Sequence, residues 1–254
     1  MGEAGRIEFR GIHKSFGRQV VLRGVDLTVH EGETLVLLGP SGTGKSVLIK
    51  HAIGLLRPDA GDVFVDGVSI VRATPEELLA VRRRVGYVFQ NAALFDSMTV
   101  LENLWLALDD DRNLRSVESC RDEAAELLEK VNLDRTVLDK YPAELSGGMR
   151  KRVGIARAIA SRPKYLLYDE PTTGLDPVNA ENIDRLIMEL RRELGVTSIV
   201  VTHDLESAFQ VGDRIALLYE GRIHACGTPD AILANDDPVV RKFVRRGRID
   251  AVVA

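Results

Sequence analysis

Two short segments of the chain carry residue types that suit phosphate chemistry. The segment GPSGTGKS, residues 39–46, follows an apolar run at 34–38 and precedes a helix-like stretch. Its glycines let the backbone curl so that successive N–H groups point at one anion, and the following helix adds its positive end. The segment YLLYDE, residues 165–170, is an apolar strand that ends in two adjacent carboxylates. Because burying a carboxylate is costly unless it is paired, this strand end predicts a cation site.

The spacing of residues 39–46 fits the pattern G-x-x-x-x-G-K-S, which predicts a P-loop that binds a nucleoside triphosphate. Lys45 is expected to contact the β- and γ-phosphates, and the Ser46 hydroxyl to ligate Mg²⁺. Asp169 is expected to hold the same ion, which leaves Glu170 to polarise the water that attacks the γ-phosphate. ATP and Mg²⁺ are therefore the predicted cofactors. The predicted binding residues of the loop are Gly39, Pro40, Ser41, Gly42, Thr43, Gly44, Lys45 and Ser46.

Three further residues suit the same chemistry. Gln90 ends the apolar run GYVFQ, and its amide is expected to ligate Mg²⁺ or to contact the attacking water. His203 ends the run SIVVTH and is expected to donate a hydrogen bond to the γ-phosphate. Phe16, in KSFG, is an aromatic residue expected to stack on adenine. Each alone fits an ordinary surface residue, but their order after a P-loop favours one nucleotide site.

The segment LSGGM, residues 145–149, opens an arginine-rich helical pattern. A Ser-Gly-Gly sequence at a helix N-terminus predicts a second anion site, formed by Ser146, Gly147 and Gly148. The alternative for this segment taken alone is an ordinary turn. Asp176, in GLDP, is also expected among the nucleotide-site residues.

Strand and turn signals dominate the first third of the chain. Residues 6–36 alternate short apolar runs with glycine turns, and Asp66-Gly67 predicts a hairpin within GDVFVDGVSI. Thr74 and Pro75 predict the start of a helix, as its N-cap and first residue. These signals predict an antiparallel β layer around the P-loop strand.

The remainder of the chain completes an α/β fold. Residues 91–160 are mostly helical in pattern and predict a helical sub-domain. From residue 164, strand-like runs alternate with helical stretches, which is typical of βαβ units on a parallel sheet. The fold class is therefore a P-loop NTPase (RecA-like) core with an antiparallel β layer and a helical sub-domain. One domain is predicted at 6–246, followed by a C-terminal tail at 247–254.

Composition narrows the class of protein. The formal net charge is −4 and 28% of the residues are charged, with both signs mixed, which argues against a dedicated nucleic-acid binder. Cys120 and Cys226 form no Cys-x-x-Cys spacing and fit reduced thiols in a cytosolic protein. No apolar run approaches the roughly 18 residues of a membrane span. Work at a membrane would therefore need another chain to hold this one there.

The motifs, in their order and spacing, resemble those of the ATP-binding subunit of an ABC transporter over about residues 6–235. The P-loop, Gln90, LSGGM, YLLYDE, GLD and His203 carry this resemblance. It implies that LSGGM binds the γ-phosphate of ATP held by the opposite subunit. The chain has one P-loop and one such segment, which agrees with a head-to-tail homodimer whose two sites are each built from both chains.

Four segments resemble the ATPases of MCE-type lipid transporters, which include the Mla system of Gram-negative bacteria. They are LSGGM followed by RKR, and residues 91–104, 167–178 and 235–244. This resemblance implies a subunit on the cytoplasmic face of the inner membrane that drives phospholipid movement. Its implied partners are integral-membrane permease subunits and an MCE-type lipid-binding protein, with no nucleic acid.

Three other functions remain as alternatives. Importers of small polar solutes, such as amino acids, share most of the motifs. A soluble ABC-type ATPase that acts on nucleic acid or ribosomes would tend to carry two cassettes or long coiled-coil insertions. A regulatory nucleotide switch without turnover would need no base, so Glu170 argues against it.

Two segments suggest contacts outside the nucleotide site. The stretch 91–108 is apolar, and the region near Phe95 and Met98 is expected to receive a short permease helix, with internal packing as the alternative. The residues considered for this groove are Leu94, Phe95, Met98, Leu101, Leu104 and Trp105. The tail is basic, with Arg241, Lys242, Arg245, Arg246 and Arg248. It is expected to touch anionic lipid headgroups or to be solvated. The resemblance to lipid-transport ATPases implies a third alternative, in which the tail reaches across to the other subunit.

Overall fold

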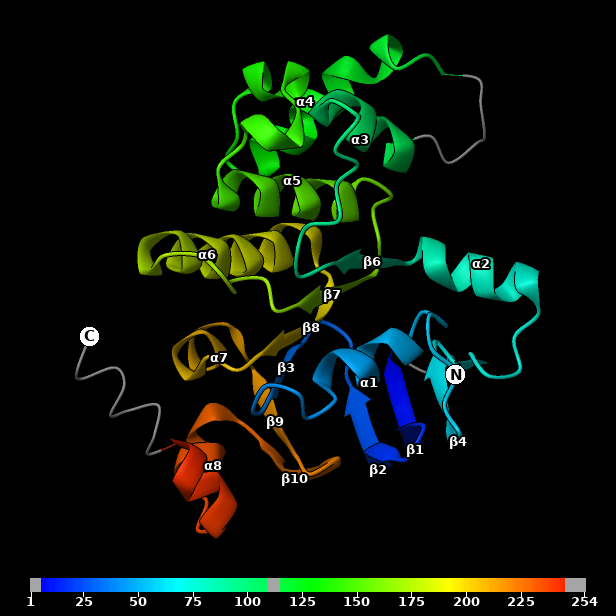
Figure 1. Ribbon diagram of the computed structural model, residues 1–254, viewed down its shortest axis with the longest axis vertical. Helices are drawn as coiled ribbons and strands as arrows, with labels where there is room; N and C mark the ends of the chain where they lie inside the picture. Colours follow the sequence, from blue (N-terminus) through cyan, green and yellow to red (C-terminus); the bar gives the residue numbers. More distant parts are fainter. Residues whose placement is uncertain (1–5, 109–114, 245–254) are drawn as a thin grey trace. The chain divides into compact units, whose positions relative to one another are not determined.

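The computed structural model describes residues 6–108 and 115–244 (Figure 1). The chain divides into two compact units. The first, called the P-loop unit below, comprises residues 1–82 and 196–254. The second, called the helical unit, comprises residues 83–195. Each unit holds its own strands and helices.

The P-loop unit contains the predicted antiparallel layer. Its sheet has the order β2-β1-β4-β5, with every pair antiparallel. Asp66 and Gly67 form the turn between β4 and β5, with φ of 49° and 79°, as a two-residue hairpin with positive φ requires. The predicted hairpin is therefore confirmed. The strands are β1 (Ile7–Phe16), β2 (Gln19–Val29), β4 (Ala60–Val65) and β5 (Val68–Ser69).

The same unit contains parallel strands that carry the P-loop. Strand β3 (Thr34–Leu38) lies between β8 (Thr197–Thr202) and β9 (Arg214–Tyr219), parallel to both. All residues of β3 and β8 are buried, as expected for strands covered on both faces. Strand β10 (Arg222–Gly227) pairs antiparallel with β9.

The helices of this unit begin at identifiable caps. Thr74 caps α2 (Pro75–Arg83): its hydroxyl accepts from the Glu77 N–H at 3.2 Å, and the Glu77 carboxylate accepts from the Thr74 N–H at 2.9 Å. This reciprocal pair is a capping box, so the predicted helix start is confirmed. The other helices are α1 (Lys45–His51), α7 (Leu205–Val211) and α8 (Pro229–Leu233), with helical residues again at 238–244.

Within its described residues, the helical unit joins two parallel strands to four helices. Strands β6 (Val85–Val88) and β7 (Tyr165–Asp169) pair in parallel. Helix α5 (Gly147–Ile159) contacts the other three helices of the unit (Figure 1). The other helices are α3 (Val100–Leu108), α4 (Arg121–Lys130) and α6 (Pro177–Leu194), and the 3₁₀ turns are η1 (Glu118–Cys120), η2 (Arg135–Asp139) and η3 (Pro142–Glu144). The helical character predicted at 91–160 is thus present in these elements.

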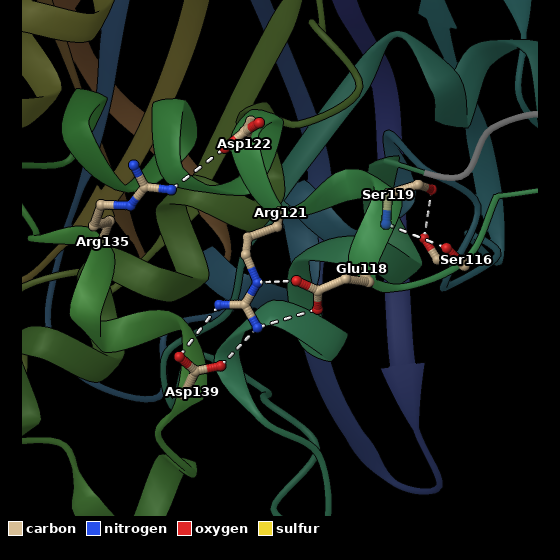
Figure 2. A network of polar contacts seen from close by, with 7 residues as sticks. All are labelled: Ser116, Glu118, Ser119, Arg121, Asp122, Arg135 and Asp139. Atoms are coloured by element: carbon tan, nitrogen blue, oxygen red, sulfur yellow. Dashed lines mark hydrogen bonds and ion pairs between the residues drawn. The ribbon is translucent and has the colours of Figure 1, made fainter.

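Arg121 ties together the outer turns of this unit, as Figure 2 shows. Its guanidinium donates to both carboxylate oxygens of Glu118, at 2.5 and 3.2 Å, and to both of Asp139, at 2.8 and 3.2 Å. The hydrogen bonds from Arg121 hold the pKa of Asp139 below its usual range. The planar fork of arginine thereby joins η1, α4 and η2 in one defined arrangement.

Candidate functional site

The P-loop has a backbone that only glycine can supply at two of its positions. Gly39 has φ of 158° and Gly44 has φ of 100°. A Cβ at Gly39 would lie 2.2 Å from the Leu218 carbonyl oxygen, and one at Gly44 would lie 2.7 Å from a Val21 methyl carbon. Lys45 is buried, and its Nζ donates to the carbonyl oxygens of Gly39 at 2.8 Å and Pro40 at 3.1 Å. The loop therefore curls around its own lysine, whose ammonium group is held by main-chain carbonyl oxygens of the loop.

His203 lies at the same sheet edge as the P-loop. Leu38, the last residue of β3, is in register with Thr202, the last residue of β8. His203 follows Thr202 directly and is exposed, while the loop at 39–46 follows Leu38. Because parallel strands end at one edge of a sheet, the strand pairing brings these two predicted site elements together.

Phe16 ends β1 with its ring 47% exposed, and Lys14 Nζ lies 5.5 Å from the ring centroid. A separate cavity of about 630 Å³ lies beside the P-loop. Its wall includes Pro40, Gly42 and Thr43, and Phe16 is not part of it. The remaining lining residues are Gln19, Val20, Val21, Arg23, Tyr219, Glu220, Gly221, Arg222 and His224.

The two adjacent carboxylates of the helical unit are buried and have different partners. Asp169 Oδ2 accepts a hydrogen bond of 2.9 Å from the Tyr87 hydroxyl. Burial and this neighbouring carboxylate raise the pKa of Tyr87. Glu170 Oε2 accepts one of 2.9 Å from the Thr173 hydroxyl, and Glu170 itself has φ of 51°. A positive φ is uncommon for a residue with a side chain, so surrounding contacts must hold this backbone in place.

Gln90 lies at the same end of the strand pair as these carboxylates. Val88 is in register with Tyr168, and Gln90 is the second residue after the end of β6. The strand predicted at GYVFQ therefore ends two residues earlier than expected.

Lys151 joins these two strand ends, although no motif predicts it. Its Nζ donates to the carbonyl oxygen of Glu170 at 3.2 Å and, through a short hydrogen bond, to that of Gln90. Burial lowers the pKa of Lys151, and the nearby Glu170 and Asp169 carboxylates partly offset this effect. A sequence signal does exist, because Lys151 has helical spacing with the buried positions Gly148 and Ile155.

The LSGGM segment opens a helix, as predicted. Ser146 is the N-cap of α5, and its hydroxyl accepts from the Met149 N–H at 3.2 Å. The first turn of α5 contains no acidic residue, so its free N–H groups and positive end suit an anion. A Cβ at Gly148 would lie 3.0 Å from Asn179 Oδ1, so this segment packs closely against the start of α6.

Asp176 has a defined structural role next to this segment. It is the N-cap of α6, and its carboxylate accepts from the Asn179 backbone N–H at 3.1 Å and from the Asn179 side-chain amide at 2.6 Å. These hydrogen bonds hold the pKa of Asp176 below its ordinary value. Asp176 thereby positions Asn179 against Gly148.

The predicted residues thus gather in two sets, one in each unit. The P-loop unit holds residues 39–46 and His203 at the ends of β3 and β8, and the helical unit holds Gln90, Asp169 and Glu170 after the ends of β6 and β7. Within residues 6–108 and 115–244, no cluster of three or more His, Cys, Asp or Glu side chains could hold a metal ion. Each set offers oxygen atoms of the kind that Mg²⁺ prefers: the Ser46 hydroxyl in the P-loop unit, and the Gln90 amide and Asp169 carboxylate in the helical unit.

A family model and two related sequences match this chain, and all of them concern transporters or their ATP-binding proteins. The ABC transporter family model matches residues 22–173. The probable ribonucleotide transport ATP-binding protein mkl of Mycobacterium tuberculosis is 41% identical over 246 residues, which are 97% of this chain and 68% of that protein. The sulfate/thiosulfate import ATP-binding protein CysA of Caulobacter vibrioides is 42% identical over 228 residues, which are 89% of this chain and 66% of that protein.

Two solved structures are similar over most of the chain. A dimeric post-hydrolysis state of the ATP-binding cassette MJ0796, bound to ADP and Pi, superimposes with a TM-score of 0.79 at 35% identity, covering 87% of this chain and 98% of that one. The cbiO1 protein of Clostridium perfringens, part of the complex cbiONQ, gives a TM-score of 0.80 at 27% identity and covers 99% of both chains. Among the described residues of this chain, no helix is long and apolar enough to cross a membrane.

Proposed function

The chain belongs to the ABC transporter family as an ATP-binding cassette that hydrolyses ATP with Mg²⁺, and we propose that it drives a phospholipid transporter of the MCE type. The P-loop NTPase fold, the ATPase activity and the two cofactors expected from the motifs are confirmed by this membership. The lipid substrate and the roles of individual residues are the proposal.

Roles toward ATP and Mg²⁺ are proposed for the residues of each set. Lys45 and the curled backbone of 39–46 would hold the β- and γ-phosphates, and Ser46, Gln90 and Asp169 would hold Mg²⁺. When bound, the ion would supply positive charge beside the phosphate oxygens. Glu170 accepts a proton from the attacking water, and His203 donates to the γ-phosphate. The register of β3 with β8, which puts His203 beside the P-loop, is the observation that supports this site most directly.

Members of this family act as dimers of cassettes with membrane permease subunits, and the second anion site is proposed to serve the partner's nucleotide. The capped N-terminus of α5 has no acidic residue in its first turn, which suits the γ-phosphate of ATP bound to the other chain. Asp176, through Asn179, holds the start of α6 against Gly148 and so shapes this surface. The adenine is proposed to stack on the exposed ring of Phe16.

The permease contact is proposed to centre on Phe95. Its side chain is 54% exposed, whereas Leu101 and Leu104 are buried and belong to the interior of the helical unit. Buried Asn103 organises the loop that carries Phe95: its side chain accepts from the Phe95 N–H at 2.8 Å and donates to the carbonyl oxygens of Phe95 and Met98, both at 3.2 Å. A rigid loop that presents one aromatic ring suits a short apolar helix from a permease.

The remaining residues of the predicted groove are less available. Leu94 and Met98 are half-buried, and the indole N–H of half-buried Trp105 donates to the Arg115 carbonyl oxygen at 3.1 Å. Internal packing therefore accounts for most of the apolar segment, and the proposed contact is confined to the Phe95 side of it.

The proposal of a lipid substrate rests on the resemblance of four segments to MCE-type ATPases. They are LSGGM and residues 91–104, 167–178 and 235–244. In the last of these, the Asp237 carboxylate accepts from the Val239 N–H at 2.8 Å and the Val240 N–H at 3.1 Å, which caps the helical residues 238–244. Of the basic residues there, Arg241 and Lys242 are described, and Arg245, Arg246 and Arg248 lie outside the described residues. We place the protein on the cytoplasmic face of the inner membrane, bound peripherally to its permease.

Affinity purification of the intact complex from membranes tests this proposal. The expected co-purifying chains are a permease and an MCE-type lipid-binding protein, identified by mass spectrometry, with phospholipid in the extract. A solute-binding protein and a nutrient permease in their place would support the importer alternative, since relatives include proteins named for sulfate/thiosulfate and methionine import.

A further inference from the structure

One buried ammonium group connects two parts of the catalytic machinery that are far apart in sequence. Lys151 Nζ donates to the main-chain carbonyl oxygens of Gln90 and Glu170, and the side chain is 7% exposed. A buried ammonium is costly unless its donors find acceptors, and here two main-chain acceptors are supplied. The hydrogen bonds fix the backbone at both residues rather than their side chains.

The same face of α5 holds the residues that follow Gln90. Gly154, one turn after Lys151, would place a Cβ 3.0 Å from Ala92 Cβ, so helix and loop are in direct contact. Arg157, one turn further, donates to the carbonyl oxygens of Ala92 at 3.0 Å and Ala93 at 2.6 Å. Spacings of three residues keep these side chains on one side of the helix.

The loop and the carboxylate segment both have backbones that need support. Ala92 and Ala93 have φ of 60° and 50°, and Glu170 has φ of 51°. A side-chain-bearing residue in this region costs free energy and persists only where its surroundings hold it. Lys151 contacts the carbonyl of Glu170 itself and the loop just before Ala92, so it lies between the two strained segments.

We infer that Lys151 is a positioning residue that fixes the loop after Gln90 and the backbone of Glu170 in one arrangement. The inference rests on the proposed roles of Gln90 and Glu170. Because Ser146 caps the same helix, a nucleotide at the start of α5 and a permease that displaces the Gln90 loop would act on the same ammonium group. Displacement of that loop would thereby change how the Glu170 carboxylate is presented to water.

Lys151→Met and Lys151→Arg in the full chain test this inference. Met keeps the length and apolar stem of lysine but donates no hydrogen bond, so we expect kcat to fall about tenfold or more with the KM for ATP within about threefold, because misplacement of a catalytic group mainly affects the chemical step. Arg retains donors and should restore part of kcat. Lys130→Met, at an exposed lysine in α4, is the matched control and should change neither constant.

Hydrogen exchange without nucleotide gives a second readout. Peptides that cover residues 90–95 and 167–173 should both exchange faster in Lys151→Met than in the parent chain, and Lys130→Met should leave them unchanged. Faster exchange in only one peptide, or an unchanged kcat, would overturn the inference. An equal loss of nucleotide affinity and kcat would also overturn it, since it would indicate a general structural role.

Two additional variants make the outcome unambiguous. Lys151→Gln replaces Lys151→Met if the latter does not fold. Its side chain is shorter than lysine and uncharged, so we expect the same fall in kcat. A normal kcat in Lys151→Gln would refute the positioning role. Glu170→Gln separates this inference from the proposed function. Full hydrolysis by Glu170→Gln would refute the proposed base, whereas loss of hydrolysis there together with a normal Lys151→Met would refute the positioning role alone.

Discussion

The Tyr87 hydroxyl donates a 2.9 Å hydrogen bond to Asp169, so the carboxylate proposed to hold Mg²⁺ is oriented by a phenol on the neighbouring strand. Residues that orient a metal ligand typically change metal affinity by about 10- to 100-fold when removed. Tyr87→Phe should therefore raise the Mg²⁺ concentration that gives half-maximal ATPase activity. The phenyl ring can still pack on Phe89, whose ring centroid lies 4.4 Å away. Tyr141→Phe, at an exposed tyrosine, is the control, and an identical Mg²⁺ requirement in both variants would contradict the role of Tyr87.

Glu170→Gln should remove the proposed base while preserving shape. We expect ATP binding to survive, and turnover to fall by a factor on the order of 10² or more, because a positioned base typically contributes that much. A closed ATP-bound dimer should then accumulate, which gel filtration with ATP and Mg²⁺ can detect. Near-normal hydrolysis by the purified variant would eliminate Glu170 as the base.

Mixing two inactive variants tests whether each site is built from both chains. Lys45→Ala removes the charge proposed to contact the phosphates, and Ser146→Arg places a bulky cation at the start of α5. If sites form in trans, a mixed dimer has one site with both defects and one with neither, so about half of a normal dimer's activity is expected from it, by simple counting of sites. No recovery on mixing would mean that each chain uses its own LSGGM segment.

Phe95→Asp should detach the subunit from its permease without unfolding it. An unpaired carboxylate in an apolar contact weakens binding by roughly several kcal/mol. The exposed ring contributes little to the folding stability of the isolated chain. Co-purification of the permease should be lost while ATP binding remains, and cells should become sensitive to detergents. Leu106→Asp, at another exposed apolar residue of the helical unit, is the matched control. A defect confined to uptake of one nutrient would favour the importer alternative.

His51 should make folding stability depend on pH. The side chain is fully buried at the end of α1, and its Nδ1 lies 3.3 Å from the Leu48 carbonyl oxygen. Its Nε2 has no hydrogen-bond partner among the residues that the structure describes. Burial lowers the pKa of His51 in the folded chain, so the unfolded chain binds the proton more readily. The stability contributed by the neutral ring is therefore present above the unfolded pKa of about 6.5 and is lost as pH falls below it.

Urea unfolding at pH 7.5 and 5.5 measures this effect. The loss of unfolding free energy between the two pH values should be smaller in His51→Leu than in the parent chain. His30→Leu, at an exposed histidine, should behave like the parent chain. An equal pH dependence in all three chains would show that His51 does not titrate on unfolding.

Local signals were sufficient to predict the elements that carry the site. The hairpin turn at Asp66-Gly67 and the start of α2 at Thr74 each depend on residues only a few positions apart. The structure contains both the turn and the helix start. The P-loop likewise depends on neighbouring glycines and a following helix. Strand β10 was not predicted, because its residues alternate between exposed and half-buried positions and carry little apolar signal.

Contacts between distant segments account for what the sequence could not provide. The positive φ of Ala92 and Ala93 has no local cause, since Arg157 supports these residues from more than 60 positions away. Lys151 lies in a basic run whose other members are more exposed, and its two acceptors belong to separate strand ends. The carbonyl oxygens of Gln90 and Glu170 lie close together because β6 pairs with β7, and only the folded chain reveals this pairing.

The arrangement on α5 also restricts how this chain can vary in length. A helix turns by about 100° per residue, so one residue inserted between Met149 and Lys151 would leave LSGGM intact and rotate the lysine away from both acceptors. An insertion after Arg157 would not alter these contacts. Among homologues that retain Lys151 and Arg157, insertions and deletions should therefore be absent between 146 and 157 and tolerated in the exposed turn near residue 161.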